Sequence, residues 1–569
     1  MRKYTVIAIL LVFFATGALF AGGRNQGSTG GGMPTLSPQG LTGDALAFSK
    51  FTKPVDVHIG MAVNPIDSSL PRGDTAQNNQ YTRYLRDKFN INVIVDWTAA
   101  SGNDYNEKVA LSIASNTLPD GLTTGSMQMR KAAVSGMLYD ITDLFNAYAS
   151  SQVKKIIDST NGRAKEMVSY NGRMIALPHV AVTTDGIHTM HIQKNWLDQY
   201  NLQVPRTIND IENVARVFKD RKPAGARTIP IIGPDKNTKL YSNFLESTNN
   251  MNGFDPIFAA FDAYPGYFLD NKNGTASYGS LSPNMKPALE LLARWYKEGL
   301  IDPEMGTRDQ SGEPVNANEA GIRFGPWWGI GYGNNDSFIN NPNVNWQAYP
   351  VYSADGKWNS PMPASGIFSC LISKKASADT AAAIIMMYNV LTRDEAIFDT
   401  GVAIEWYPLR TILAPADECE YTYRELTKVL KGEANPANYN DPMSPYKLLY
   451  GDVQEVRSVI TGYSPNRELS VKDFNQSNRG NFNRMYSLMI GDRPFATQKV
   501  DKAVTSITYA MTDLLEQRWA NLKRMEDEIM MKIIIGQLDI SAFDKFVSDW
   551  LAQGGQAVLN DLATQFLKK

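Results

Sequence analysis

The sequence predicts an α/β protein, and two observations about its order along the chain lead to that class. Strand-like segments alternate with helix-like segments from Val55 onward, a pattern typical of sheets whose strands are joined by crossover helices. A second passage of the same kind begins near residue 170, and 569 residues leave room for two large lobes. We find no repeat of fixed short period, so a solenoid is excluded.

The first passage supplies two strands and two helices. Apolar runs over 55–63 and 91–97 predict strands, and apolar residues at helical spacing predict helices over 79–89 and 104–114. Leu118-Pro119-Asp120 marks a turn before a further short strand. This alternation predicts a parallel sheet in the first lobe.

The second passage opens with a hairpin over 170–178, because Asn171-Gly172 is a strong turn signal. A strand over 186–192 follows, and Thr207 is a candidate N-cap for the next helix. Further helices are expected over 195–200, 287–299, 377–391, 504–531, 541–553 and 556–566.

The amino-terminal segment resembles an export signal. A basic start is followed by an apolar run over 5–14 and small residues up to Ala21, which is too short for a membrane span. Residues 22–53 are rich in Gly, Ser and Thr and are expected to form a flexible tether. No cysteine precedes Cys370, so we expect an exported, periplasmic or otherwise extracytoplasmic protein that is not lipid-anchored through an N-terminal cysteine.

Net charge and cysteine content bear on possible partners and on a disulfide. A formal net charge of −2 gives no reason to expect nucleic acid. The two cysteines, Cys370 and Cys419, leave a disulfide open, although a buried free thiol suits the apolar run around Cys370 better.

The most unusual stretch is 325–333, where Trp327, Trp328 and Tyr332 lie among four glycines and a proline. Glycine and proline disfavour regular structure, so these rings are expected on a loop or at a helix start. Aromatic rings on a loop suit a platform for a sugar ring, and the alternative is that the tryptophans fill the junction between two lobes.

Four segments together resemble the extracellular solute-binding proteins, family 1, of ABC importers, in particular their long lipoprotein-like members. They are Leu118-Pro119-Asp120, the run from Asn171 to Pro205, the Phe324–Trp328 motif followed by 344–350, and the tail over 532–555. The resemblance covers nearly everything after the tether. It implies two α/β lobes joined by hinge crossings near 177–185 and 361–366, with a ligand cleft between the lobes.

The resemblance also implies the domain plan, the partners and the site. Residues 1–21 would be the signal peptide and 22–53 the tether, with 54–182 and 364–415 in the first lobe and 183–363 and 416–569 in the second. The protein would be a monomer that captures an oligosaccharide or modified sugar and passes it to the transmembrane subunits of an ABC permease. Candidate ligand-binding residues are Trp327, Trp328, Tyr332, Trp406, Asn79, Ser126, Thr183 and Asp185. From this role for Trp327 we expect Trp327→Ala to weaken ligand binding at least tenfold without harming the ligand-free fold.

Other functions have weaker support. Family members often carry a calcium loop near residue 220, but here Arg221 and Lys222 stand where carboxylates would be, so no metal and no cofactor are expected. His188 and His191 have a spacing that puts them on opposite faces of a strand, which disfavours zinc. No nucleophile elbow or phosphate loop is present, so we expect no enzyme. A peptide receptor and, less favoured, a glycoside-active enzyme remain as alternatives.

Overall fold

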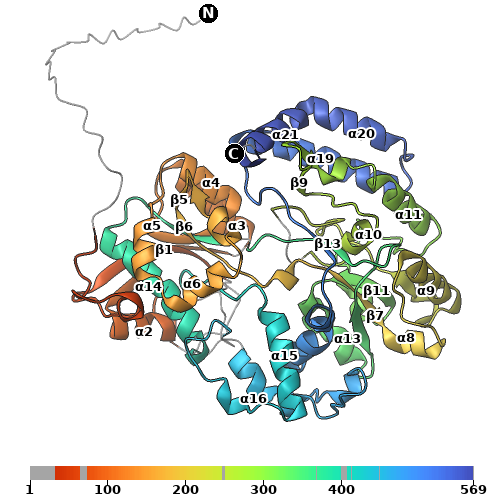
Figure 1. The fold of residues 1–569 in the computed structure, drawn as a ribbon, viewed down its shortest axis with the longest axis horizontal. Helices are drawn as coiled ribbons and strands as arrows, with labels where there is room; N and C mark the ends of the chain where they lie inside the picture. Colours follow the sequence, from red (N-terminus) through yellow and green to blue (C-terminus); the bar gives the residue numbers. More distant parts are fainter. Residues whose placement is uncertain are drawn as a thin grey trace, which may run out of the picture.

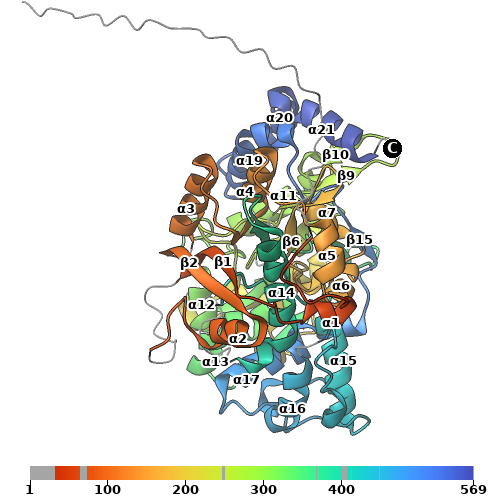
Figure 2. The ribbon, with the colours of Figure 1, turned by 90° about the vertical axis from the view of Figure 1, so that its left-hand side faces the viewer.

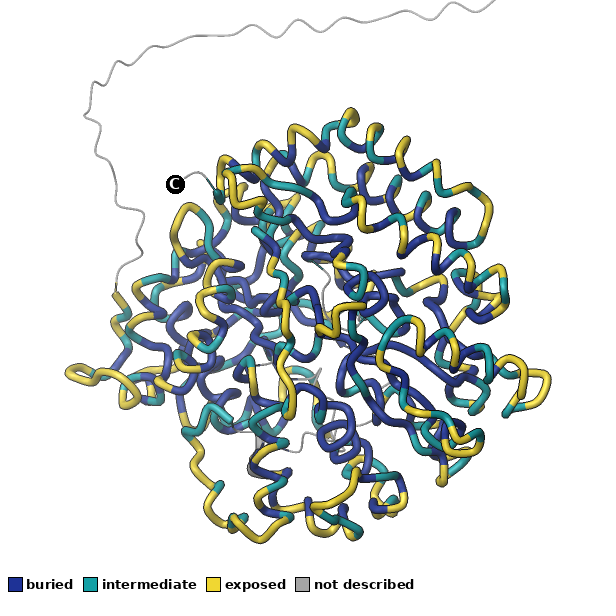
Figure 3. The backbone as a smooth tube through the Cα atoms, turned by 45° about the vertical axis from the view of Figure 1, so that its right-hand side comes forward, coloured by how far each residue is buried: buried dark blue, intermediate teal, exposed yellow. Residues whose placement is uncertain are grey.

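The computed structural model describes residues 33–63, 73–100, 102–245, 250–366, 368–398, 407–411, 413–446 and 449–567. Two lobes lie side by side, the first around β1 and α14 and the second around β7 and β11 (Figure 1). Each lobe has a buried interior and an exposed outer layer (Figure 3). The predicted α/β class with two lobes is therefore confirmed.

The first lobe is built on a five-stranded sheet in the order β2-β1-β3-β14-β6. Its strands are β1 (Val55–Val63), β2 (Ile91–Ala100), β3 (Gly121–Gly125), β14 (Phe368–Ile372) and β6 (Ala176–Pro178). The first two form a parallel pair, as do β1 and β3, whereas β14 is antiparallel to both β3 and β6. The expected all-parallel sheet is thus a mixed one, because β14 returns from the other lobe and enters in the opposite direction.

Helix α14 (Ala378–Asp394) lies across this lobe, beside β1 (Figure 2). Its many small residues allow close approach, and its side chains are buried almost all round. The other helices are α1 (Gly43–Ala47), α2 (Gln80–Phe89), α3 (Asn103–Ala114), α4 (Ser126–Val134), α5 (Thr142–Tyr148), α6 (Ser151–Asp158) and α7 (Arg163–Met167).

The later part of the predicted tether is packed structure. The Leu36 N–H and the Thr35 hydroxyl donate hydrogen bonds to Asp379 at the start of α14, and Phe51 is buried in the first core. The ordered lobe therefore begins by residue 35, earlier than residue 54, because apolar residues interrupt the polar run.

The second lobe has a four-stranded mixed sheet in the order β12-β7-β11-β8. These strands are β7 (Thr189–Gln193), β8 (Ile229–Ile231), β11 (Ala320–Gly325) and β12 (Trp346–Tyr349). The register places Thr189 opposite Gly325, so β11 ends where β7 begins. That shared end of the sheet is where the chain arrives from the first lobe.

Helices surround this sheet: α8 (Lys194–Gln199), α9 (Ile208–Arg221), α10 (Asp255–Ala260), α11 (Met285–Lys297), α12 (Gly312–Asn316), α13 (Asn335–Asn340), α15 (Glu418–Lys431), α16 (Leu449–Val459), α17 (Arg479–Tyr486), α18 (Arg493–Thr497), α19 (Asp513–Ile534), α20 (Ala542–Trp550) and α21 (Gln556–Leu562). Thr207 caps α9 as predicted, within a capping box. The sequence analysis named no element over 416–501, where α15 to α18 lie.

The long helix predicted over 504–531 starts later than expected. Residues Lys502–Val504 form β15, which pairs with β13 (Asn359–Pro361), and α19 begins at Asp513 after the N-cap Thr512. The Thr512 hydroxyl accepts a hydrogen bond from the Leu515 N–H, which fixes this start. The predicted hairpin is confirmed as β4 (Ser169–Tyr170) and β5 (Arg173–Met174), with positive φ at Asn171 and Gly172.

Three segments cross between the lobes and are hydrogen-bonded to one another. The Ala181 N–H donates to the Ser365 carbonyl at 2.8 Å, and the Ala414 N–H donates to the Val180 carbonyl at 3.0 Å. Two of these crossings match the predicted hinge segments. A further contact between lobes is the ion pair of Arg130 on α4 with Asp513 at the start of α19, at 2.8 Å.

Both cysteines are buried free thiols. Burial raises the pKa of Cys370 to about 12, so this thiol is un-ionised at neutral pH. The interpretation of Cys370 as a buried strand residue is confirmed.

Candidate functional site

The segment after β11 carries the aromatic residues singled out in the sequence. It forms two short 3₁₀ turns, Trp327–Ile330 and Tyr332–Asn334, rather than an extended loop. The backbone here packs directly on residues 487–491: a Cβ atom at Gly491 would lie 2.0 Å from the Trp327 carbonyl oxygen. Only glycine fits at that point, and this close approach fixes the position of the turn.

Trp327 points inward. Its side chain is 5 % exposed and belongs to a core that includes Ile330 and Phe338. Its indole N–H donates a hydrogen bond to Asp185 Oδ1 at 2.9 Å. The aromatic segment is thereby tied to the turn Thr183–Asp185, which directly follows the first crossing.

Trp328 and Tyr332 are more accessible than Trp327. Trp328, in the first turn, is half-buried, and Tyr332, at the start of the second turn, is 46 % exposed. A stacking platform needs an open aromatic face, so these two rings are better placed than Trp327 to contact a ligand.

Arg484 on α17 completes this surface. It binds Asp452 of α16 through two hydrogen bonds, Nε to Oδ1 at 3.0 Å and Nη2 to Oδ2 at 2.8 Å. Its guanidinium carbon lies 5.6 Å from the centre of the Trp327 ring. Arg484 was not predicted as a site residue, because it lies in a region of the sequence where no helix or strand was expected.

Asp185 occupies an unusual environment for a carboxylate. Burial raises its pKa to about 6, which outweighs the stabilisation of its charge by the Trp327 N–H and Arg484. Burial likewise raises the pKa of Glu420 to about 7, and that of Asp492 as well. Both oxygens of Asp492 are buried, and Thr184 is the neighbour whose hydroxyl favours the ionised form against this burial. This end of the second lobe therefore holds several carboxyl groups that resist ionisation.

The raised pKa of Asp185 makes a prediction for stability. Above pH 6 the folded protein holds Asp185 ionised at a cost in stability. This cost decreases as the pH falls from about 6 towards about 4, below which the carboxyl group is protonated in the folded and the unfolded state alike. Asp185→Asn removes this pH dependence, so its stability relative to the wild type should rise by about 1–2 kcal/mol between pH 5 and pH 8. The measurement is urea unfolding of both proteins at the two pH values. Asp185→Leu should lose a constant amount of stability at every pH and should show, in addition, the same pH-dependent difference from the wild type. If the difference in free energy of unfolding between wild type and variants does not change with pH, the raised pKa of Asp185 is contradicted.

On the first lobe, the residues nearest the crossings include one aromatic that the sequence analysis did not select. Phe368 begins β14, pairs with Gly125 and is 50 % exposed. It stacks on His179 of the first crossing, with ring centres 6.0 Å apart and planes 10° apart. Phe368 directly follows the second crossing in the sequence, and this position could have identified it as a candidate site residue. Ser126, one of the predicted site residues, is half-buried at the start of α4, at the same edge of the sheet. Met127 follows it and is 47 % exposed.

The remaining predicted residues have different surroundings. Asn79 is fully buried as the N-cap of α2, and its side chain accepts hydrogen bonds from the Tyr81 and Thr82 N–H groups. Its side chain thus has a structural role in this conformation. Thr183 is half-buried, and its N–H donates to the Ala416 carbonyl at 2.8 Å. Trp406 lies outside the described residues.

Two side chains of a type that can bind metals have local partners. Asp270 pairs with Lys272 at 3.0 Å in the turn between β9 (Phe268–Asp270) and β10 (Ala276–Tyr278). His188 Nδ1 lies 3.1 Å from Asp255 Oδ2. No group of three metal-ligating side chains occurs in the part of the chain that the structure describes.

Two lobes joined by hydrogen-bonded crossings, with aromatic residues on both sides of those crossings, define a binding protein of the hinged two-lobe class. The profile of the bacterial extracellular solute-binding protein family matches residues 67–382, and the chain belongs to that family. Among the described residues, none of the helices has the length and apolar character needed to span a bilayer.

Curated relatives include the fructooligosaccharide ABC transporter substrate-binding protein FusA of Streptococcus pneumoniae, 26 % identical over 38 % of this chain and 40 % of FusA. Lipoprotein LipO of Bacillus subtilis is 24 % identical over 40 % of this chain and 43 % of its own. The chain thus spans about two fifths of the length of these two relatives. The polygalacturonan/rhamnogalacturonan-binding protein YtcQ of Bacillus subtilis is 21 % identical over 81 % of this chain and 83 % of YtcQ.

Solved structures share the fold. A solute-binding protein from Bifidobacterium longum infantis, associated with an HMO-binding ABC transporter, has a TM-score of 0.57 at 16 % identity, over 90 % of this chain and 98 % of its own. FusA of S. pneumoniae in complex with kestose has a TM-score of 0.55 at 16 % identity, over 90 % of this chain and 99 % of its own. At such low identity the likeness establishes the fold alone.

Proposed function

We propose that this protein is the substrate-binding component of an ABC importer and that it captures an oligosaccharide or modified sugar between its lobes. The observation that carries the proposal is the placement of accessible aromatic side chains beside the crossings on both lobes. Phe368 is on the first lobe, and Trp328 and Tyr332 are on the second. Sugar rings pack well on such faces, and polar groups beside them bind the hydroxyls.

Closure follows from the way each aromatic group is attached to a crossing. Phe368 stacks on His179 and Trp327 is bonded to Asp185, so the two groups are linked by a short stretch of one crossing segment. A ligand that contacts both groups stabilises the closed arrangement and shifts the equilibrium between open and closed forms. The lobes in this proposal are 54–182 with 364–415, extended at its start to include the packed residues from about 35, and 183–363 with 416–569.

The proposal includes the protein's place and partners. The protein acts outside the cytoplasm as a monomer without enzymatic activity, and its closed form docks on the transmembrane subunits of a permease. The similarity to FusA, a fructooligosaccharide-binding protein, and to YtcQ, a polygalacturonan/rhamnogalacturonan-binding protein, supports a carbohydrate cargo. A peptide receptor is the alternative, and the aromatic surfaces favour sugar over peptide.

A thermal-shift screen of the chain beyond Ala21 tests the class of ligand. Fructooligosaccharides, other neutral oligosaccharides, oligogalacturonides and short peptides form the panel. A ligand at a hundred times its dissociation constant adds about 2.7 kcal/mol to the free energy of unfolding, which is a visible shift. A sugar that stabilises the protein supports the proposal, and stabilisation by peptides alone would replace it with the peptide receptor.

Tyr332 gives the first site-specific test. Because its ring is half-exposed, Tyr332→Ala should keep the ligand-free stability within about 1 kcal/mol and weaken binding of the sugar found in the screen about tenfold. Isothermal titration measures the dissociation constant, and Tyr332→Phe is the matched control that keeps the ring. Unchanged binding by Tyr332→Ala would remove Tyr332 from the site.

A further inference from the structure

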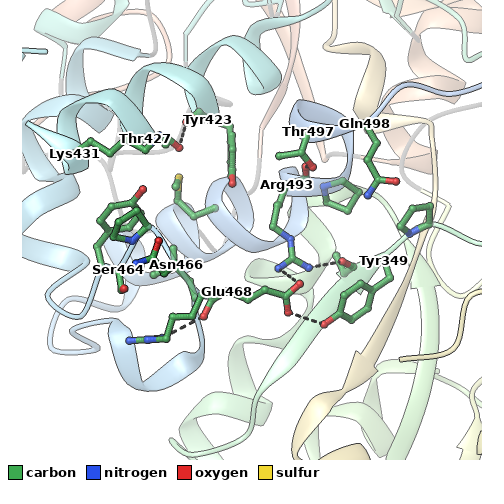
Figure 4. Close-up of a pocket in the computed structure, with 18 residues that line it drawn as sticks. Tyr349, Tyr423, Thr427, Lys431, Ser464, Asn466, Glu468, Arg493, Thr497 and Gln498 are labelled. Carbon is green, nitrogen blue, oxygen red and sulfur yellow. Dashed lines mark hydrogen bonds and ion pairs between the residues drawn. The ribbon is translucent and has the colours of Figure 1, made fainter. Parts of the chain in front are cut away.

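A groove in the second lobe is formed by two adjoining cavities of about 510 and 540 Å³. They share four lining residues: Tyr349, Pro350, Glu468 and Gln498. We call this surface the tyrosine groove, with Tyr349, Tyr352, Tyr423 and Tyr463 along its length. It lies between α15, the loop after α16 and the end of β12 (Figure 4).

The middle of the tyrosine groove is held in place by its own side chains. The Tyr349 hydroxyl donates to Glu468 Oε2 at 3.0 Å, and Arg493 Nη1 lies 2.9 Å from Glu468 Oε1. Arg493 also donates to the Ala348 carbonyl at 3.2 Å and lies over the Tyr349 ring at 5.2 Å (Figure 4). A surface fixed in this way loses little conformational entropy when it binds a ligand.

Aromatic and polar groups alternate along the groove. Tyr423 and Tyr463 are half-buried in the first cavity, where Thr427 and Asn466 offer hydrogen-bonding groups. In the second cavity Tyr352 bonds to Gln498, and the Arg206 guanidinium lies 4.6 Å from the Tyr352 ring centre. Flat rings interleaved with hydroxyl and amide groups suit a chain of sugar rings.

The charges of the tyrosine groove indicate which sugars suit it. Arg493 is paired with Glu468 and Arg467 with Asp473. Lys431 in the first cavity and Arg206 in the second form no ion pair with another described residue, so the groove retains a positive balance. A carboxylate-bearing sugar complements such cations, and arginine binds carboxylates especially well.

We propose that the tyrosine groove is a second carbohydrate site, separate from the interlobe site, that binds a short chain of uronic acid residues. The rings stack on Tyr423 and Tyr463, and carboxylates face Lys431 and Arg206. Because this site lies outside the hinge, it binds without closure of the two lobes. It would hold the end of an acidic polysaccharide chain near the protein.

Methionine methyl groups distinguish the two sites. Met489 lines the tyrosine groove, and Met127 is exposed at the interlobe edge of the first lobe. With 13C-methyl methionine labelling, trigalacturonate at up to about 10 mM should shift the Met489 signal, a range that detects millimolar affinity. Neutral maltotriose should leave that signal in place. The Met127 signal reports the interlobe site independently, so failure of one proposal does not imply failure of the other.

Substitutions complete the test. Tyr463→Ala should weaken the Met489 response to trigalacturonate about tenfold, and Lys431→Ala should weaken it about three- to fivefold. Lys428→Ala is the matched control, because Lys428 lies on the same helix and pairs with Glu425 at 2.7 Å. An unmoved Met489 signal, an equal response to maltotriose, or variants that behave as the wild type would each overturn the proposal.

Discussion

Trp327→Ala should lower the free energy of unfolding of the ligand-free protein by about 3–5 kcal/mol, the usual cost of deleting a buried large aromatic side chain. The indole is 5 % exposed and packs in the core beneath α17. Its loss leaves a cavity and also removes the N–H donor of Asp185, whose carboxylate already resists ionisation. This revises the expectation that the variant would keep its fold intact.

Urea unfolding measures this loss. The slope of unfolding free energy against urea concentration should be the same in variant and wild type, which shows that only stability has changed. Trp327→Phe is the matched variant: it refills most of the volume and loses chiefly the hydrogen bond to Asp185, which is worth about 1–2 kcal/mol. If Trp327→Ala unfolds within about 0.5 kcal/mol of the wild type, the packing described for this residue is wrong. Binding should therefore be compared first between Trp327→Phe and the wild type.

Local patterns predicted much of the fold. The strand over 55–63, the helix capped by Thr207 and the Asn171-Gly172 hairpin appear where the sequence placed them, because each depends on neighbours in the chain. The mixed sheets were not predicted. The direction of β14 depends on a return from the other lobe, and strand periodicity carries no information about that direction.

The candidate site was harder to predict for a related reason. Residue type identified Trp327 and Trp328 together, but only packing distinguishes the buried ring from the accessible one. Asn79 was a candidate ligand-binding residue, yet it has the local signature of an N-cap. Arg484 reaches Trp327 from more than 150 positions away, and no pattern in one sequence indicates such a pairing.

Arg484→Met should cost about 3–5 kcal/mol, because it leaves Asp452 as a buried charge without its partner. The side chain of Asp452 is 8 % exposed, and both of its oxygens bind Arg484. The loss should fall mainly on α16 and α17, which this pair connects. Urea unfolding gives the total, and hydrogen exchange of the two helices locates it.

A double-mutant cycle separates the pair from simple loss of volume. Arg484→Met with Asp452→Leu removes both charges, so most of the loss in the single variant should be recovered. Additive effects would show that the two side chains do not stabilise each other. Arg484→Lys keeps the charge but cannot form the two-bond pairing, and should lie between the wild type and Arg484→Met.

The same series tests whether Arg484 also serves the ligand. Its guanidinium lies over Trp327, and Tyr332 is close enough for Arg484 to lower its pKa against the rise caused by burial. If Arg484 only supports the core, the double variant should recover ligand affinity together with stability. If it binds sugar hydroxyls directly, stability should return while affinity stays low, since leucine and methionine replace polar groups with apolar ones. Titration calorimetry on the double variant therefore decides between a supporting and a binding role.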